Sequence, residues 1–127
     1  MSLNIGDKIP DFSLVNYDKE SFKSEDFLGK KTMFVFMPFP FSSVCDGEIC
    51  ELRDNIDAFK SADTDTVMIT VAAGPTNRAW ANHYNIEFPI LADFWPHGEV
   101  SKQFGCFHDG VGISLRYTYI TNEENVI

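Results

Sequence analysis

The stretch TMFVFMPFPFSSVCDGEIC, residues 32–50, joins an apolar strand pattern to an amphipathic helix pattern. Its first six residues form a nearly continuous apolar run, which is typical of a central strand covered on both faces. Pro38 and a second proline two positions later end this strand, because proline lacks an N–H donor and restricts the residue before it to extended geometry. We therefore predict a helix that begins after about Phe41, with Ser42 or Ser43 as its N-cap.

Strand and helix patterns alternate through the rest of the chain, without a linker, a repeat or a low-complexity tract. The further elements that we expect are a buried strand at 66–73, a helix from about Pro75 with Trp80 and Tyr84 on one face, a turn and short helix at 93–104, a strand at 115–121 and a turn at 122–125. This order predicts an α/β sandwich. A chain of 127 residues, 44% of them hydrophobic, can bury one core, so we expect a single domain over residues 1–127.

The formal net charge of −9 argues against two classes of partner. Nucleic acids and anionic membranes both favour basic patches, so we expect neither to bind. The sequence also contains no apolar run of membrane-spanning length and no signal-peptide pattern, which leads us to expect a cytoplasmic protein. It has no phosphate-binding glycine loop, no dinucleotide fingerprint and no zinc-ligand spacing, so we expect no cofactor and no metal.

Cys45 lies in the first turn of the predicted helix and is the first candidate for chemistry. Unpaired backbone N–H groups and the helix dipole favour an anion at this position, and the thiolate is the reactive form of cysteine. A cysteine that only fills the core is the alternative. The neighbouring acids Asp46 and Glu48 oppose a second negative charge, so a cationic partner is needed. Three arginines are available for that purpose, at positions 53, 78 and 116.

Pro38, Ser42 and Cys45 stand at the spacing P-x-x-x-[T/S]-x-x-C, which resembles the active-site signature of the peroxiredoxins. Further segments are similar to motifs of the same family in the same order. They are the opening-strand segment at 6–14, the F-P-I-L-A-D segment at 88–93, and the segments at 94–98 and 104–107, which most resemble the alkyl hydroperoxide reductase E subgroup. The resemblance covers nearly the whole chain and implies a thioredoxin-like fold.

Domains of this family usually continue with a partner strand and a closing helix beyond the last turn, whereas this sequence stops at Ile127. We therefore expect either a fragment that lacks the C-terminal strand and helix or an unusual ending. A strand at 115–121 without that neighbour would have an open edge, which favours association. We expect stability or solubility to depend on contacts in an oligomer, and the resemblance implies a homodimer.

The resemblance implies a thiol peroxidase in which the Cys45 thiolate attacks the terminal oxygen of a peroxide and becomes a sulfenic acid. The Ser42 hydroxyl and the backbone N–H of Val44 or Cys45 would hold the peroxide. Among the three arginines, the resemblance selects Arg116, which would stabilise the charge on the leaving oxygen.

The resemblance also gives roles to two residues beside this group. Pro38 would shield the sulfur from solvent, and Glu48 would orient the arginine. Three alternatives remain open at this point. Arg116 could be an exposed residue at a strand end, Ser42 could be only the helix cap, and Glu48 could be a solvated carboxylate that the helix dipole favours.

Cys50 decides whether the cycle uses a second cysteine of the same chain. The apolar stripe of the predicted helix continues from Cys45 through Ile49, Leu52, Ile56 and Phe59. Cys50 is turned about 140° away, onto the polar side with Asp54 and Asp57. Helical residues five apart have Cα atoms roughly 8 Å from each other, too far for an unstrained disulfide, so the helix would have to unwind, and Gly47 would lower that cost.

The C-x4-C spacing resembles the bacterioferritin comigratory branch of the family, whose resolving cysteine lies in the same helix as the attacking one. Relatives in the reductase E subgroup that lack a cysteine at position 50 work as one-cysteine enzymes. We predict resolution by Cys50, with a buried structural cysteine as the alternative. Cys106 has aromatic neighbours, so we expect it to serve packing and keep it as a spare resolving candidate.

The sequence leaves open both the identity of the reductant and the location of two large aromatic residues. Thioredoxin fits a two-cysteine cycle, whereas the subgroup resemblance implies a mycoredoxin with mycothiol. Phe94 and Trp95 could line the peroxide entrance or a subunit contact, but we favour a place in the core. The alternatives to a peroxidase are a thiol–disulfide oxidoreductase, which the lack of a C-x-x-C motif disfavours, and a non-enzymatic redox sensor or holdase.

Overall fold

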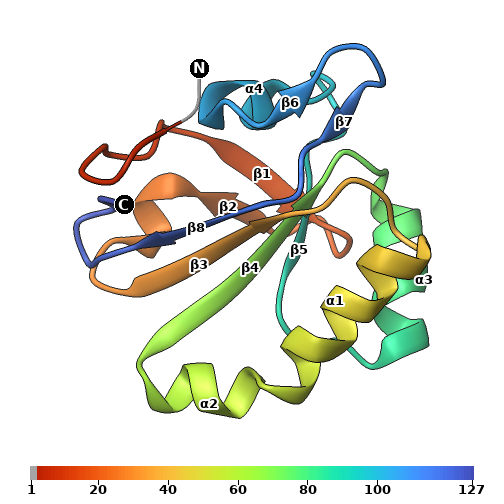
Figure 1. The fold of residues 1–127 in the computed structure, drawn as a ribbon, viewed down its shortest axis with the longest axis horizontal. Coiled ribbons are helices and arrows are strands. Elements are labelled where there is room, and N and C mark those ends of the chain that lie inside the picture. The colour runs from red at the N-terminus through yellow and green to blue at the C-terminus, as the bar shows by residue number, and fades with distance from the viewer. Residues whose placement is uncertain (1–2) are drawn as a thin grey trace.

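The computed structural model describes residues 3–127 and contains a mixed six-stranded sheet in the order β2-β1-β5-β4-β3-β8 (Figure 1). Its strands are β1 (Ser13–Asn16), β2 (Ser21–Lys23), β3 (Lys31–Phe36), β4 (Thr64–Thr70), β5 (Ile90–Ala92) and β8 (Tyr117–Thr121). A two-stranded sheet joins β6 (Phe107–His108) to β7 (Ile113–Ser114). The helices are the 3-10 helix η1 (Ser24–Phe27), α1 (Ser43–Asp54), α2 (Ile56–Ser61), α3 (Gly74–Tyr84) and α4 (Glu99–Phe104).

The centre of the sheet is parallel and its borders are antiparallel. β3, β4 and β5 run parallel, β1 is antiparallel to β5, and β8 is antiparallel to β3. α1, α2 and α3 lie on one side of this sheet and α4 on the other (Figure 1). The predicted α/β sandwich is therefore confirmed, because helices cover both faces of the central strands.

Alternation along β3 separates two hydrophobic cores. The Cys45 core lies under α1 and α3 and consists of Met33, Val35, Met37, Cys45, Ile49, Met68, Trp80, Ala81, Ile86, Phe88 and Ile90. The Cys106 core lies on the opposite face and consists of Ile9, Phe12, Leu14, Phe27, Phe34, Phe36, Val67, Ile69, Leu91, Val100, Phe104, Cys106 and Tyr119. Each core takes alternate residues of the same strand, so β3 is buried on both faces, as its apolar run predicts.

Several predicted boundaries shift in the structure. The predicted strand at 66–73 is β4, which begins two residues earlier and ends at Thr70, because the next three residues form the turn into α3. The apolar stripe through Phe59 is divided between two helices, since α1 ends at Asp54 and Asn55 has non-helical dihedral angles. Of the segment at 6–14, only the last two residues belong to β1, with an isolated bridge from Lys8 to Val126.

The C-terminal part follows the expectation closely. The strand predicted at 115–121 is β8, and the Asn125 N–H donates to the Asn122 carbonyl in the turn that follows. β8 pairs with β3 alone and forms one border of the sheet within residues 3–127. None of the helices in this range combines the length and the apolar character that a membrane span requires.

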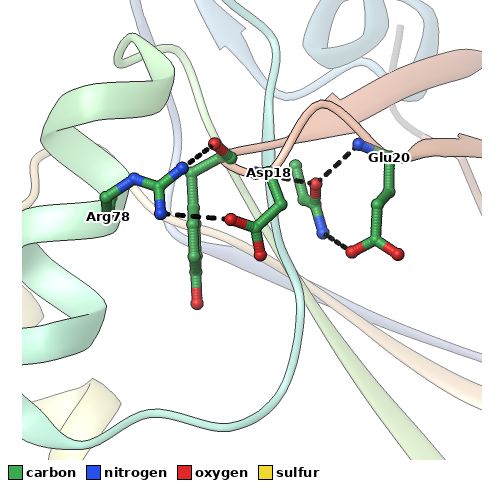
Figure 2. A network of polar contacts seen from close by, with 5 residues as sticks. Asp18, Glu20 and Arg78 are labelled. Atoms are coloured by element: carbon green, nitrogen blue, oxygen red, sulfur yellow. Dashed lines mark hydrogen bonds and ion pairs between the residues drawn. The ribbon is translucent and has the colours of Figure 1, made fainter.

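The N-terminal half of α3 is fixed to the turn between β1 and β2 (Figure 2). The Arg78 guanidinium is 3.1 Å from the Asp18 carboxylate, donates to the Tyr17 carbonyl and lies over the Tyr17 ring. Asn16 shapes the same turn, because its side-chain oxygen accepts from the backbone N–H groups of Asp18 and Glu20. The network connects α3 to the turn between β1 and β2.

Candidate active site

Cys45 occupies the first turn of α1, and its side chain is fully buried. Ser42 is the N-cap with extended dihedral angles, and its hydroxyl oxygen accepts from the Cys45 N–H at 3.3 Å. The predicted helix start and cap are therefore confirmed. The preceding loop is strained, because Phe41 has φ +68°, a value that residues with a side chain rarely adopt. Such strain is typical of functional loops, where the surrounding structure holds an unfavourable backbone in place.

Arg116 reaches the Cys45 sulfur because of the register between two strands. β8 begins beside the end of β3, with Tyr117 opposite Phe36, so Arg116 lies beside Met37 on the face that carries Cys45. Its Nη2 is 3.3 Å from the Cys45 Sγ, and its Nη1 is 3.3 Å from the Met37 Sδ. The guanidinium therefore brings a positive charge and hydrogen-bond donors into direct contact with the sulfur.

Glu48 accepts a hydrogen bond from the same guanidinium that contacts Cys45. It lies one helical turn after Cys45, and its Oε2 accepts from Arg116 Nη1 at 2.9 Å. Partial burial opposes the charged form of Arg116, yet the hydrogen bonds to Glu48 and Cys45 raise its pKa above the ordinary value. Arg116 is exposed and directly precedes β8, as the alternative of an exposed strand-end arginine describes, and Glu48 is partly exposed. Both side chains nevertheless have partners, because Arg116 contacts Cys45 and Glu48, so their roles stay predictions.

Asp46 faces away from this group, toward α3. Its Oδ1 accepts from the Trp80 indole N–H at 2.8 Å and its Oδ2 accepts from the Tyr84 hydroxyl at 2.6 Å. The hydrogen bond to Asp46, followed by burial, raises the pKa of Tyr84 to about 12, so the phenol remains a donor at neutral pH. The sequence places Trp80 and Tyr84 on one helix face, but it does not indicate that this face would meet Asp46.

Pro38 follows directly after Met37 at the end of β3 and is half-buried. Two aromatic residues of the same loop, Phe39 and Phe41, and the nearby Val44 are exposed apolar side chains. Four of the predicted residues thus lie together: Arg116 contacts both Cys45 and Glu48, and Ser42 is bonded to the Cys45 amide.

Cys50 is not on a fully polar surface, so this part of the prediction is wrong. It is partly buried and packs at the border of the Cys45 core, because α1 turns the side of the helix that carries Cys50 toward α3. Asp54 is exposed, and Asp57 belongs to α2 beyond the break at Asn55. Gly47, between the two cysteines, is exposed, and a Cβ built there would have no neighbour within 4 Å.

Cys106 is fully buried on the opposite face of the sheet from Cys45. Burial raises the pKa of its thiol to about 12, although the Tyr119 hydroxyl partly opposes this effect. A disulfide with Cys45 would have to cross the sheet. The geometry agrees with a packing role and disfavours Cys106 as a resolving cysteine.

The place predicted for Phe94 and Trp95 in the core is wrong. Phe94 is 51% exposed and Trp95 is 82% exposed, and both line a cavity of about 430 Å³ beside Arg78, away from the residues around Cys45. The reason is the buried Asp93 carboxylate, which accepts from the Val100 and Ser101 N–H groups and so shapes the turn at 94–98, in which Phe94 and Trp95 are exposed. Among residues 3–127, no cluster of His, Cys, Asp and Glu side chains has the composition of a metal site.

Comparison with protein families and curated proteins gives a consistent result. The AhpC/TSA family profile matches residues 5–127. The chain is similar to alkyl hydroperoxide reductase E of Mycobacterium tuberculosis, with 36% identity over 126 residues that cover 98% of this chain and 82% of the relative. It is also similar to peroxiredoxin-4 of Bos taurus, with 30% identity over 91% of this chain and 44% of the relative.

Solved structures support the same fold. The structure is similar to Enterococcus faecalis AhpC, with a TM-score of 0.87 and 27% identity over 100% of this chain and 78% of that chain. Peroxidoxin BcpB from Mycobacterium tuberculosis has a TM-score of 0.89 over 98% of this chain and 82% of that chain. Its 22% identity makes it a comparison of fold alone.

Proposed function

Because the chain belongs to the AhpC/TSA family of peroxiredoxins and is a thiol-dependent peroxidase, we propose that Cys45 is the thiol that attacks the peroxide. The observation that carries this proposal is the contact of 3.3 Å between Arg116 Nη2 and the Cys45 Sγ. It gives a fully buried sulfur a permanent cationic partner. The substrate is a peroxide, and the electrons come from a thiol reductant.

In the proposed reaction, the Cys45 thiolate attacks the terminal oxygen of the peroxide. An S–O bond forms, the O–O bond breaks, and the leaving oxygen takes a proton to become water or an alcohol. Arg116 stabilises the negative charge that develops on the oxygens, which is the largest contribution expected in such a site. Its contact with Glu48 keeps the guanidinium in place while the sulfur changes its charge.

The remaining residues hold the peroxide. The Cys45 N–H donates to the Ser42 oxygen, so we assign the peroxide to the Val44 N–H and the Ser42 O–H. Ser42 would act both as helix cap and as donor, because its oxygen accepts one hydrogen bond while its proton is donated in another. Pro38 would restrict the access of water to the sulfur.

Completion of the cycle requires a second thiol, and we propose Cys50. The Cys45 sulfenic acid and the Cys50 thiol would condense to a disulfide with loss of water, after the first turn of α1 unwinds. Thioredoxin would then reduce the disulfide. If the sulfenic acid persists instead, a mycoredoxin with mycothiol is the expected reductant. A cytoplasmic location belongs to the same proposal because the cycle needs a reducing supply of thiols, and a homodimer is its expected assembly.

Replacement of single cysteines tests the assignment. Cys45→Ser is expected to lower the second-order rate of hydrogen peroxide consumption by about a thousandfold or more, because serine cannot supply a comparable nucleophile. Cys106→Ser is the matched control and should leave this rate unchanged. Full activity of Cys45→Ser would refute the assignment, and slow oxidation of Cys45 in the unaltered protein would favour a thiol–disulfide oxidoreductase.

A further inference from the structure

Asp46, in the first turn of α1 beside Cys45, is hydrogen-bonded to two residues of α3. We propose that these three residues form a latch, and that its opening sets the rate at which Cys45 reaches Cys50. This Asp46 latch consists of the Asp46 carboxylate and its two donors, Trp80 and Tyr84. The inference rests on the proposed function, because it concerns the step in which Cys50 resolves the Cys45 sulfenic acid. Asp46 acts as a positioning residue for this step.

The geometry of the latch uses both carboxylate oxygens. Trp80 and Tyr84 lie four residues apart on α3, so both donors are on the face that meets α1. Asp46 directly follows Cys45, and the distances to the two donors are 2.8 Å and 2.6 Å. Trp80 is fully buried, so its N–H would lose its partner in the protein if Asp46 moved away. An unpaired buried donor is unfavourable, and the latch therefore resists opening.

The two sides of the latch differ in their contacts. Near its middle, α3 is connected to the turn between β1 and β2 through Arg78 (Figure 2), and its last residue, Tyr84, accepts through its carbonyl from Arg53 near the end of α1 at 2.9 Å. The other side is the first turn of α1, which continues into the exposed and unpacked Gly47. Opening of the latch therefore displaces the Cys45 turn and leaves α3 in place.

The chemical step explains why the latch must open. Cysteines five residues apart in a helix have Cα atoms roughly 8 Å from each other, beyond the span of an unstrained disulfide. The turn that carries Cys45 and Asp46 must therefore leave its helical position. The Cys50 sulfur then attacks the Cys45 sulfenic sulfur, an S–S bond forms and the S–O bond breaks. The departing hydroxide takes the Cys50 proton and leaves as water.

The first test separates the two steps by rapid mixing. In Tyr84→Phe, disulfide closure after Cys45 oxidation should be about tenfold faster, which corresponds to the loss of roughly 1.4 kcal/mol from the closed latch. The bimolecular reaction with hydrogen peroxide should be unchanged, because Arg116 and Ser42 are untouched. Tyr17→Phe is the matched control, since the Tyr17 hydroxyl takes part in no hydrogen bond found within residues 3–127. If the disulfide between Cys45 and Cys50 closes at the same rate in Tyr84→Phe and Tyr17→Phe, the latch proposal is wrong.

A second test does not depend on the redox chemistry. Amide hydrogen exchange of the reduced protein should become about tenfold faster at residues 43–47 in Tyr84→Phe and in Asp46→Asn, with unchanged exchange in β4. Unchanged exchange at residues 43–47 contradicts the latch. If peroxide leaves Cys45 unoxidised, the proposed function is wrong. Amide hydrogen exchange at residues 43–47 still tests whether the latch controls the opening of the first turn of α1. A Cys45 sulfenic acid that never forms a disulfide overturns the role in resolution.

Discussion

Cys45 and Cys106 are equally buried, each with 0% exposure, but they lie on opposite faces of the same sheet in different surroundings. Cys45 lies in the first turn of α1, with the Arg116 guanidinium 3.3 Å from its sulfur. Cys106 lies among aromatic side chains, and burial raises the pKa of its thiol to about 12. Two equally buried thiols on opposite faces of one sheet therefore differ in the charges and hydrogen-bond donors around the sulfur. We expect these surroundings, and not burial alone, to decide which thiol reacts.

Removal of the cation beside Cys45 should have the largest effect on the difference in reactivity that we expect between Cys45 and Cys106. Arg116→Met keeps the length of the side chain without its charge and should lower the bimolecular rate with peroxide by about a hundredfold to a thousandfold. The rate is measured by stopped-flow mixing of the reduced protein with peroxide. Arg78→Met is the control, because Arg78 contacts Asp18 and Tyr17 and has no contact with the Cys45 sulfur among residues 3–127. Equal rates for the two variants would contradict a role of Arg116 in the reaction.

Alkylation compares the two thiols directly in one sample. With iodoacetamide at about pH 8, native Cys45 should be modified about a hundredfold faster than Cys106, because only the thiolate reacts and burial raises the pKa of the Cys106 thiol to about 12. Peptide mass spectrometry at successive times gives both rates. The same reaction in urea is the control, and there the two cysteines should react alike. Similar rates in the folded protein would show that the surroundings of the two thiols do not differ as described.

The smallest expected effect concerns stability at alkaline pH. Because the folded pKa of Cys106 is raised to about 12, the unfolded chain releases this proton first, and the stability contributed by the neutral thiol is lost as pH rises through the interval from about pH 9 to pH 12. Cys106→Ala should therefore lose stability less steeply over this range. Urea unfolding at several pH values measures the difference, and parallel curves for both proteins would refute it.

The local part of the site could be predicted from the sequence, because it depends on residues close together in the chain. Two prolines and a serine pair define the start of α1, and this start places Cys45 in the first turn. The apolar run of β3 likewise indicates a strand buried on both faces. In both regions, a short stretch of sequence contains the whole physical reason for the structure.

The long-range part could not be derived in this way. Arg116 reaches Cys45 through the pairing of β8 with β3, two strands far apart in the sequence, and only a family resemblance singled it out. The bond between Asp46 and Tyr84 depends on how α1 packs on α3. Trp95 is exposed because it lies in the turn that follows the buried Asp93, whose hydrogen bonds shape this turn. Periodicity describes single elements and contains no information on such contacts.

The most direct test of the central claim is to find which sulfur is oxidised first. Reduced protein is mixed with one equivalent of hydrogen peroxide, quenched with an alkylating agent after milliseconds to seconds, and mapped by peptide mass spectrometry. We predict that Cys45 is modified first, as a sulfenic acid or as a disulfide with Cys50, while Cys106 remains a free thiol. Early oxidation of Cys106 with Cys45 intact would contradict the account.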